Sequence, residues 1–248
     1  MVSKNQKKLI RSLLQKKYRK QKGLFVAEGK KVISELFDAG MRLHTIFGLD
    51  PELFSAKVPA FEVISEVDLK TISFLTTPQQ ALAIFHIPEQ AEIKTDELIV
   101  ALDDVRDPGN LGTIIRLCDW FGVSNLICSE QTVDCYNPKV VQATMGSIAR
   151  VSVTYLHLNQ YLKEKVSKNI PVYGTFMQGN TIYTESLVSK GIIVFGNEAN
   201  GISPEVASLI THQITIPRFG KQQATESLNV ATATAIVLSE FQRRTFQK

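Results

Sequence analysis

Residues 98–129 read LIVALDDVRDPGNLGTIIRLCDWFGVSNLICS, and this stretch decides the fold. The runs LIVALDDV and SNLICS are rich in β-branched and other apolar residues, and the segment between them has its apolar residues at helical spacing. Strands that are apolar on both faces are typical of a parallel sheet covered by helices. The stretch therefore predicts a strand, a helix and a second strand of such a sheet.

Four more β-rich runs follow, at 151–156, 171–176, 191–196 and 212–217, with helical segments among them. We expect residues 98–248 to form one α/β domain with a parallel sheet. A long helix from about Leu228 to Arg244 should close this domain. Its sequence, ATATAIVLSEF, lacks a charged outer face, so we expect burial on more than one side, within the domain or against a second subunit.

The part of the chain before residue 98 predicts a smaller α/β domain. Between residues 23 and 88, short apolar runs and amphipathic segments follow in the order strand, helix, strand, strand, helix, strand. Residues 89–97 are polar and acidic, which favours a linker. Residues 1–22 read as a separate basic helix with leucines at helical spacing.

Positive charge is concentrated at the N-terminal end. Residues 1–31 hold eleven Lys or Arg against one acidic residue, which gives this segment a net charge of +10. Since the whole chain has a net charge of +4, the remaining residues have a net charge of −6. This asymmetry points to a polyanionic partner such as a nucleic acid. Two other interpretations stay open: a solvated helix that keeps the protein soluble, and a helix on a membrane surface, although no Trp or Phe is present to anchor it.

Several classes of protein are disfavoured. The chain has neither an apolar run of about 18 residues nor a signal peptide, so we expect a cytoplasmic protein. The spacing of Cys118, Cys128 and Cys135 fits neither a disulfide framework nor zinc ligands, so reduced thiols are expected. The four histidines are scattered, which argues against a metal site. No GxSxG motif of a serine hydrolase is present.

Three loops at the carboxyl ends of predicted strands carry polar residues, and this edge is where parallel sheets bind ligands. The first loop has a Pro108-Gly109 turn and places Asn110 as the cap of the following helix. Arg116 lies six residues further on, among apolar neighbours. Taken alone, Arg116 fits an ion-paired structural residue as well as a functional one.

The second loop, GNEANGIS at 196–203, has the spacing of a phosphate-binding loop, but Ile202 replaces the required lysine. This excludes a nucleotide triphosphatase and leaves a glycine turn that holds Asn197 and Glu198 at a strand end. The third loop, at 216–236, brings Ser227 to a helix start, where capping alone would explain it. We expect the three loops to converge on one pocket.

These loops resemble the three motifs of the SpoU/TrmH family of RNA ribose 2′-O-methyltransferases, in the SPOUT superfamily. The motifs are NLGTIIR at 110–116, VFGNEANGIS at 194–203 and IPRFGKQQATESLNVATATAI at 216–236. The stretch 24–86, with FVAEG and TTPQQALAIF, is similar to the ribosomal-protein-like substrate-binding domain of many members. Gln80 stands where many of these have glycine.

The resemblance implies S-adenosylmethionine as methyl donor, a trefoil knot in the C-terminal domain, and a homodimer whose site takes residues from both subunits. It implies that the cofactor is bound largely through backbone groups of Gly196, Ile216 and Leu228. It also implies that the reacting end is lined by Asn110, Arg116, Glu198, Ser227 and Asn229.

The resemblance further implies RNA as substrate, with ribosomal RNA favoured over transfer RNA. A guanidinium is a poor base, so we expect Arg116 to bind a phosphate and stabilise the developing alkoxide rather than to remove the proton of the hydroxyl. Glu198 would orient Arg116 or the ribose. A catalytically silent RNA-binding or assembly factor is the alternative from another class.

Overall fold

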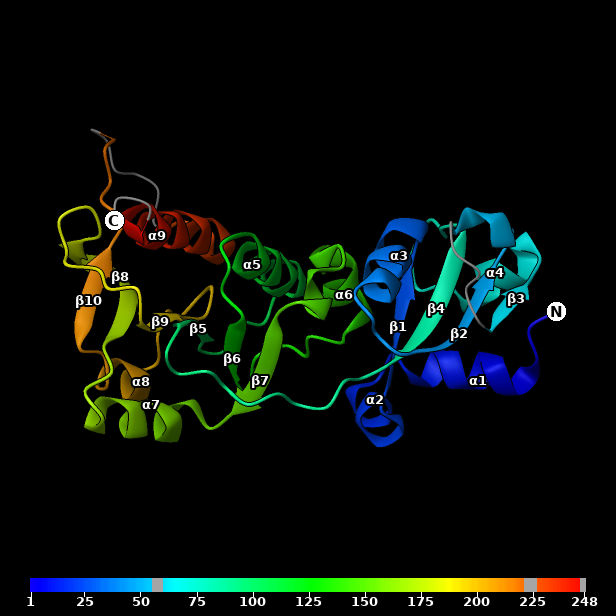
Figure 1. The fold of residues 1–248 in the computed structure, drawn as a ribbon, viewed down its shortest axis with the longest axis horizontal. Coiled ribbons are helices and arrows are strands. Elements are labelled where there is room, and N and C mark those ends of the chain that lie inside the picture. The colour runs from blue at the N-terminus through cyan, green and yellow to red at the C-terminus, as the bar shows by residue number, and fades with distance from the viewer. Residues whose placement is uncertain (55–59, 221–226, 246–248) are drawn as a thin grey trace. The chain divides into compact units, whose positions relative to one another are not determined.

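The computed structural model describes residues 1–54, 60–220 and 227–245. The chain divides into two compact units, whose elements are labelled in Figure 1. The first unit combines Met1–Glu89 with Asp134–Arg150, and the second combines Gln90–Val133 with Val151–Lys248. Each unit has a sheet of its own.

The second unit is built on a six-stranded sheet in which all neighbouring strands run parallel, in the order β10-β8-β9-β5-β6-β7. The strands are β5 (Leu98–Leu102), β6 (Asn125–Ser129), β7 (Ser152–Leu156), β8 (Val172–Thr181), β9 (Gly191–Phe195) and β10 (His212–Thr215). Five of them lie within predicted runs, and β8 begins in the run at 171–176 but continues to Thr181. Every residue of β5, β6 and β9 is buried, as expected for central strands covered on both faces.

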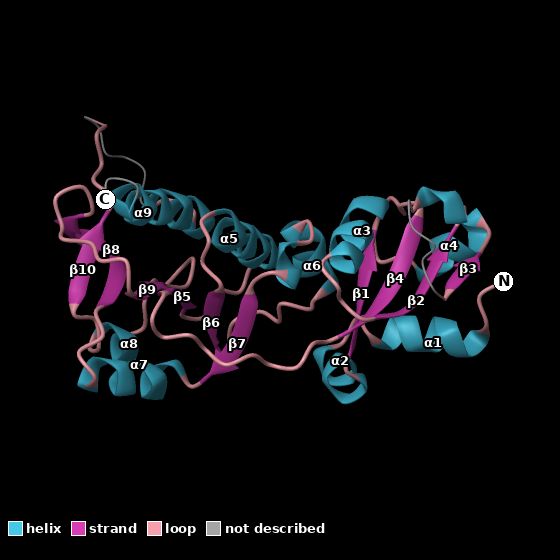
Figure 2. Ribbon diagram, viewed as in Figure 1, coloured by secondary structure: helices cyan, strands magenta, loops and turns pink. Residues whose placement is uncertain are grey.

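Helices cover both faces of this sheet (Figure 2). They are α5 (Pro108–Trp120), α7 (Leu158–Ser167), α8 (Pro204–Ala207) and α9 (Val230–Thr245). Helices α5 and α9 pack side by side on one face, and α7 and α8 lie on the other, where Leu162 and Val206 join the core. The predicted closing helix is confirmed as α9. Its Val237 and Leu238 are fully buried.

The first unit has a mixed four-stranded sheet in the order β1-β4-β2-β3. Its strands are β1 (Leu24–Glu28), β2 (Leu43–Gly48), β3 (Phe61–Val63) and β4 (Ala81–His86), with α3 (Lys30–Asp38), η1 (Pro51–Leu53) and α4 (Glu66–Ile72) between them. Strand β4 runs antiparallel to β1 and β2, and β2 runs parallel to β3. The predicted order of strands and helices is confirmed.

Residues 1–22 form two helices, α1 (Lys4–Ser12) and α2 (Lys16–Lys22), where one was expected. Ile10 and Leu13 are fully buried in the core of the first unit, so this segment is part of that core. Between the two helices, the Arg19 guanidinium donates to the carbonyl oxygens of Leu13 and Leu14, at 2.7 and 2.8 Å. These carbonyls, just beyond the end of α1, thereby have hydrogen-bond partners although the helix does not continue.

The segment Asp134–Arg150, which separates β6 from β7, belongs to the first unit. It contains α6 (Pro138–Thr144) and η2 (Ser147–Ala149). The ring of Tyr136 packs on Phe25, with centroids 4.8 Å apart. Gly146 has a φ of +100°, and a Cβ there would lie 2.4 Å from Cβ of Glu35. The apolar pattern of α6 predicts a buried face but carries no information on which sheet that face contacts.

In the described ranges, no helix is long and apolar enough to cross a bilayer. The three cysteines are buried and none forms a disulfide. Burial raises the pKa of the Cys118 thiol. Among the same residues, no group of three or more His, Cys, Asp or Glu side chains could hold a metal ion.

Candidate active site

A cavity of about 1430 Å³ lies in the second unit, beside the loops that follow β9 and β10. Drug-sized ligands occupy pockets of roughly 300 to 1,000 Å³, so a nucleoside cofactor fits this volume. Six of the eight predicted site residues line it: Gly196, Glu198, Ile216, Ser227, Leu228 and Asn229. Residues 221–226 of the third loop lie outside the described residues.

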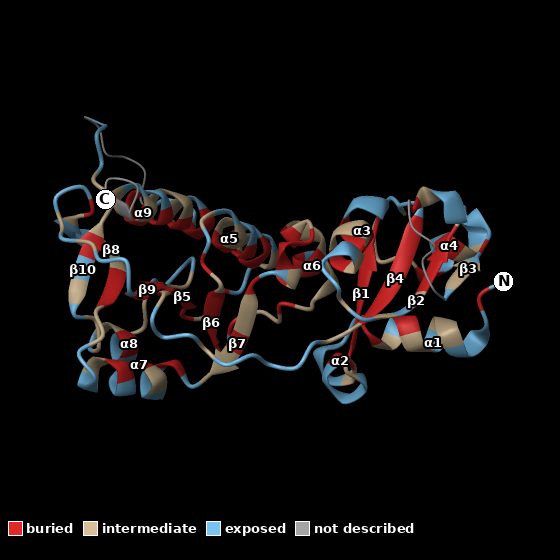
Figure 3. Ribbon diagram, viewed as in Figure 1, coloured by how far each residue is buried: buried red, intermediate tan, exposed pale blue. Residues whose placement is uncertain are grey.

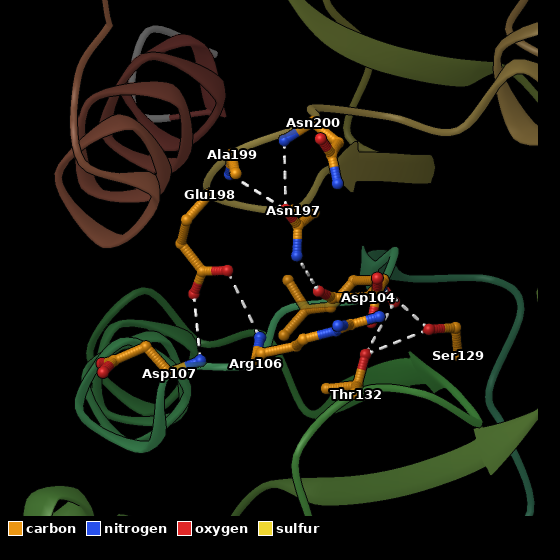
Figure 4. Close-up of polar contacts among 10 residues, drawn as sticks. Asp104, Arg106, Asp107, Ser129, Thr132, Asn197, Glu198, Ala199 and Asn200 are labelled. Carbon is orange, nitrogen blue, oxygen red and sulfur yellow. Dashed lines mark hydrogen bonds and ion pairs between the residues drawn. The ribbon is translucent and has the colours of Figure 1, made fainter.

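The loop after β9 is tied down by Asn197 (Figure 4). The Asn197 side chain accepts from the backbone N–H groups of Ala199 and Asn200, at 2.9 and 3.1 Å, and donates to the carbonyl oxygen of Asp104 at 2.6 Å. At the far end of the loop, the N–H of Ser203 donates to the Asp103 carboxylate at 2.8 Å. Both ends of the loop are therefore fixed to the carboxyl end of β5.

Gly196 is the first residue of this loop, and the backbone at the other end of the loop occupies the space where a side chain at position 196 would lie. A Cβ at Gly196 would lie 2.1 Å from the carbonyl carbon of Gly201 and 2.2 Å from the nitrogen of Ile202. Non-bonded carbon and nitrogen atoms do not approach each other this closely, so no residue other than glycine fits at position 196 unless the loop opens. The sequence predicts a glycine turn here, and the structure gives its physical reason: only a residue without a side chain at position 196 allows the turn to close.

Glu198 projects from the loop toward the start of α5 (Figure 4). Its carboxylate accepts from the backbone N–H groups of Arg106 and Asp107, at 3.3 and 3.2 Å, and from Nδ2 of Asn110 at 3.0 Å. Partial burial acts to raise the pKa of Glu198, but the hydrogen bonds from Asn110 and these backbone groups outweigh it. The net pKa is lower than usual. Glu198 is therefore an ionised acceptor at neutral pH.

Asn110 is not the helix cap that the sequence predicted. Asp107 caps α5, accepting from the N–H of Asn110 at 2.8 Å, because Pro108 is suited to the first helical position. The Asn110 side chain is thereby left to donate to Glu198 and to accept from Nδ2 of Asn229 at 2.8 Å. These bonds join the three loops in one polar network.

The third loop ends in a cap supplied by Asn229. Its side-chain oxygen accepts from the N–H groups of Ala231 and Thr232, at 2.9 and 3.2 Å. The sequence allows Ser227 to be the cap of this helix, but in the structure Asn229 caps α9. Ser227 is exposed and lines the cavity.

Arg116 lies apart from this network. It is exposed on α5 and does not line the cavity of its own chain. The described residues give it no ion-pair partner, so they do not support the interpretation of Arg116 as an ion-paired helix residue. Within the described ranges, no hydrogen bond or ion pair joins this guanidinium to Glu198.

Comparison with known protein families agrees with these motifs. The sequence model of the SpoU rRNA Methylase family matches residues 97–239, which is more than half of the chain. The chain belongs to the SpoU rRNA methylase family. A second model, the MRM3-like substrate binding domain, matches residues 4–83 of this SpoU protein. The predicted family is thereby confirmed.

Relatives of this SpoU protein share its full length. The 23S rRNA (guanosine(2553)-2′-O)-methyltransferase RlmP of Bacillus subtilis (strain 168) is 30% identical over 95% of this chain and 96% of its own. A TrmH-family protein from Porphyromonas gingivalis is 41% identical, with a TM-score of 0.90 over 98% of this chain and 99% of its own. The AdoMet-bound rRNA methyltransferase from Sinorhizobium meliloti is 31% identical, with a TM-score of 0.84 over 98% of this chain and 97% of its own.

Sequence reasoning missed several residues of the candidate site. Thr175 to Gln178 of β8 line the cavity, although an ordinary strand pattern gave no sign of it. Asp103 and Asp104 hold the second loop. A signal for this pair existed, since two acidic residues directly follow an apolar strand, where a parallel sheet places its site.

Proposed function

We propose that this SpoU protein transfers a methyl group from S-adenosylmethionine to a ribose 2′-hydroxyl of ribosomal RNA in the cytoplasm. The cavity beside two of the three motif loops, with the Glu198, Asn110 and Asn229 network at that end of the sheet, carries this proposal. The full-length similarity to an enzyme named for 2′-O-methylation of 23S rRNA, and to an AdoMet-bound rRNA methyltransferase, supports it.

The cavity fits the cofactor chemically. It offers apolar side chains such as Ile216 and Leu228 beside backbone groups of the tight loop at Gly196, which suits a nucleoside with a polar tail. These three residues would hold the cofactor, which when bound supplies an electrophilic methyl group on a sulfonium. The order of the strands and the packing of α9 against α5 support the trefoil knot that we propose for this unit.

The reacting alcohol must be oriented and its developing negative charge stabilised. Glu198, held ionised by its three donors, is suited to accept a hydrogen bond from a ribose hydroxyl or from a guanidinium. Asn110 and Asn229 fix the direction of that carboxylate, and Ser227 lies on the cavity wall. Arg116 would bind the adjacent phosphate and stabilise the alkoxide.

We propose that Arg116 performs this role on the cavity of a second subunit in a homodimer. Its exposure on α5, outside the cavity of its own chain, supports the proposal. Trp120, on the same helix, is 83% exposed, and a large exposed aromatic side chain is typical of a protein interface.

The test is methyl transfer from labelled S-adenosylmethionine to unmodified ribosomal RNA, followed by mapping of the methylated ribose. We expect one methylated position and binding of S-adenosylhomocysteine by calorimetry. Label in transfer RNA instead of ribosomal RNA would contradict the substrate class. Cofactor or RNA binding without any transfer would favour the silent RNA-binding protein.

A further inference from the structure

Helix α1 has one buried face and one basic face. Lys4, Lys8 and Arg11 are exposed and follow each other at intervals of four and three residues, which places them on one side of the helix. The opposite side packs into the core through Ile10. On that side, Lys7 forms an ion pair with Asp68 at 3.0 Å.

Helix α2 repeats this division. Lys17, Lys20 and Lys22 are exposed, and the outer side of α2 is coloured as exposed in Figure 3. Arg19 is only 2% exposed and is paired with Asp134, to which its Nε donates at 2.9 Å. We define the basic surface as the six outward side chains Lys4, Lys8, Arg11, Lys17, Lys20 and Lys22.

The inward cations are neutralised, and those of the basic surface are not. Within the part of the chain that the structure describes, none of the six has an ion-pair partner. No acidic residue precedes Glu28 in the sequence. Glu28 itself is buried, where it accepts from the hydroxyl of Ser73 and the N–H of Phe74.

The positive charges of the basic surface destabilise helices α1 and α2. Like charges three or four residues apart on a helix repel each other, as Lys4 with Lys8 and Lys17 with Lys20 do here. The buried faces hold the helices in place despite the repulsion. A row of phosphates laid along the surface removes the repulsion and releases counterions.

We propose that the basic surface binds the phosphate backbone of the substrate ribosomal RNA, an inference that rests on the proposed function. The match of residues 4–83 to a substrate-binding domain family agrees with this choice of partner. A membrane surface is disfavoured because the apolar side of α1 is already buried in the core.

Arg19 is the positioning residue of this surface. Its guanidinium joins the end of α1 to α2 and anchors both to Asp134, a residue 115 positions further along the chain. Asp134 lies within the stretch that matches the SpoU family, between β6 and β7. The RNA-binding helix α2 is therefore held by a segment outside the substrate-binding sequence.

The test compares two full-length triple variants with the same loss of charge. One carries K17Q, K20Q and K22Q in the basic surface, and its control carries K163Q, K168Q and K190Q, which are exposed lysines of the second unit. Binding to an unmodified ribosomal RNA transcript is measured by filter retention at several salt concentrations. We expect weaker binding by the first variant and a salt slope reduced by about 2 to 3 units. The control should keep the wild-type slope.

Thermal unfolding and S-adenosylhomocysteine affinity distinguish RNA contact from a folding defect. The first variant should be at least as stable as the wild type, because repulsion is relieved, and should bind the cofactor product normally. Asp134→Asn should weaken RNA binding in the wild-type background but add little to the K17Q, K20Q, K22Q variant, since both changes act through α2. A basic-surface variant with an unchanged affinity and salt slope overturns the proposal. A wild-type protein that binds RNA at this surface but transfers no methyl group contradicts only the proposed function.

Discussion

Gly196 shows how a single residue determines the shape of the loop after β9. The space that its side chain would occupy holds the backbone of Gly201 and Ile202. Gly220 lines the same cavity, but a Cβ there would meet no atom of the described residues within 4 Å. The two glycines therefore form a matched pair.

We expect Gly196→Ala to open the loop, to cost roughly 1 to 3 kcal/mol of stability, and to reduce S-adenosylhomocysteine affinity by at least about tenfold. Gly220→Ala should change both much less. Thermal unfolding and calorimetry measure the two effects. Normal affinity in a folded Gly196→Ala protein would separate the loop from the cofactor.

Glu198 has a lowered pKa in the folded protein, so it stabilises the fold at pH values above its unfolded pKa. That contribution is lost as the pH falls through the folded pKa. Asn110→Ala removes the hydrogen bond that lowers the pKa most, so the pKa of Glu198 should rise toward its unfolded value and its pH-dependent contribution to stability should become smaller. Carbon NMR titration of the Glu198 carboxyl group measures this. Asn200→Ala is the control, because its side chain makes no bond to Glu198, and an equal shift in both variants would contradict the assignment.

Substitution of Arg116 can separate an effect on methyl transfer from an effect on stability. Since the side chain is exposed and has no ion-pair partner in the described residues, Arg116→Ala should change stability by about 0.5 kcal/mol or less. Methyl transfer should fall by about 10² or more if the guanidinium stabilises the alkoxide. Arg116→Lys should retain part of the activity if charge alone matters. Wild-type turnover by Arg116→Ala would remove Arg116 from the mechanism.

At the scale of elements, α1 is a structural part of the first unit as well as a charged one. Leu13 is fully buried in the core cluster, whereas its neighbour Leu14 is 50% exposed. Deletion of residues 1–22 would therefore expose apolar core and would not report on RNA binding alone. The charge variants of the basic surface avoid this problem.

We expect Leu13→Ala to destabilise the first unit by about 2 to 5 kcal/mol, because it leaves a cavity in a packed core. Leu14→Ala should be nearly neutral. Hydrogen exchange of amides in β1 and β4 would locate the effect. Equal, small effects of the two substitutions would show that α1 is not packed as described.

At the scale of the whole molecule, the proposed homodimer predicts complementation between two proteins whose methyl transfer is impaired for different reasons. In a mixed dimer of Arg116→Ala and Gly196→Ala subunits, one site combines an intact cavity with an intact Arg116 from the partner subunit. Mixing should therefore restore methyl transfer to a substantial fraction of the wild-type level. Light scattering of each variant checks that dimers form, and a mixture as inactive as its components would contradict a shared site.

The sequence by itself determined the fold class, because apolar periodicity and strand length are local properties of the chain. The six strands of a parallel sheet, the order of strands and helices in the smaller domain, and the closing helix followed from these patterns. The three motif loops could also be found, since polar residues at the ends of apolar runs stand out in a sequence. Membership of the SpoU family then followed from the amino-acid sequences of those loops.

Only the tertiary structure decided which side chains meet. The bond from Asn110 to Glu198 spans 88 positions, and Arg19 reaches Asp134 across 115. No local pattern encodes such pairs, because each depends on how elements distant in sequence pack in space. The same reason explains why the segment from Asp134 to Arg150 joins the first unit, and why Arg116 does not line the cavity of its own chain.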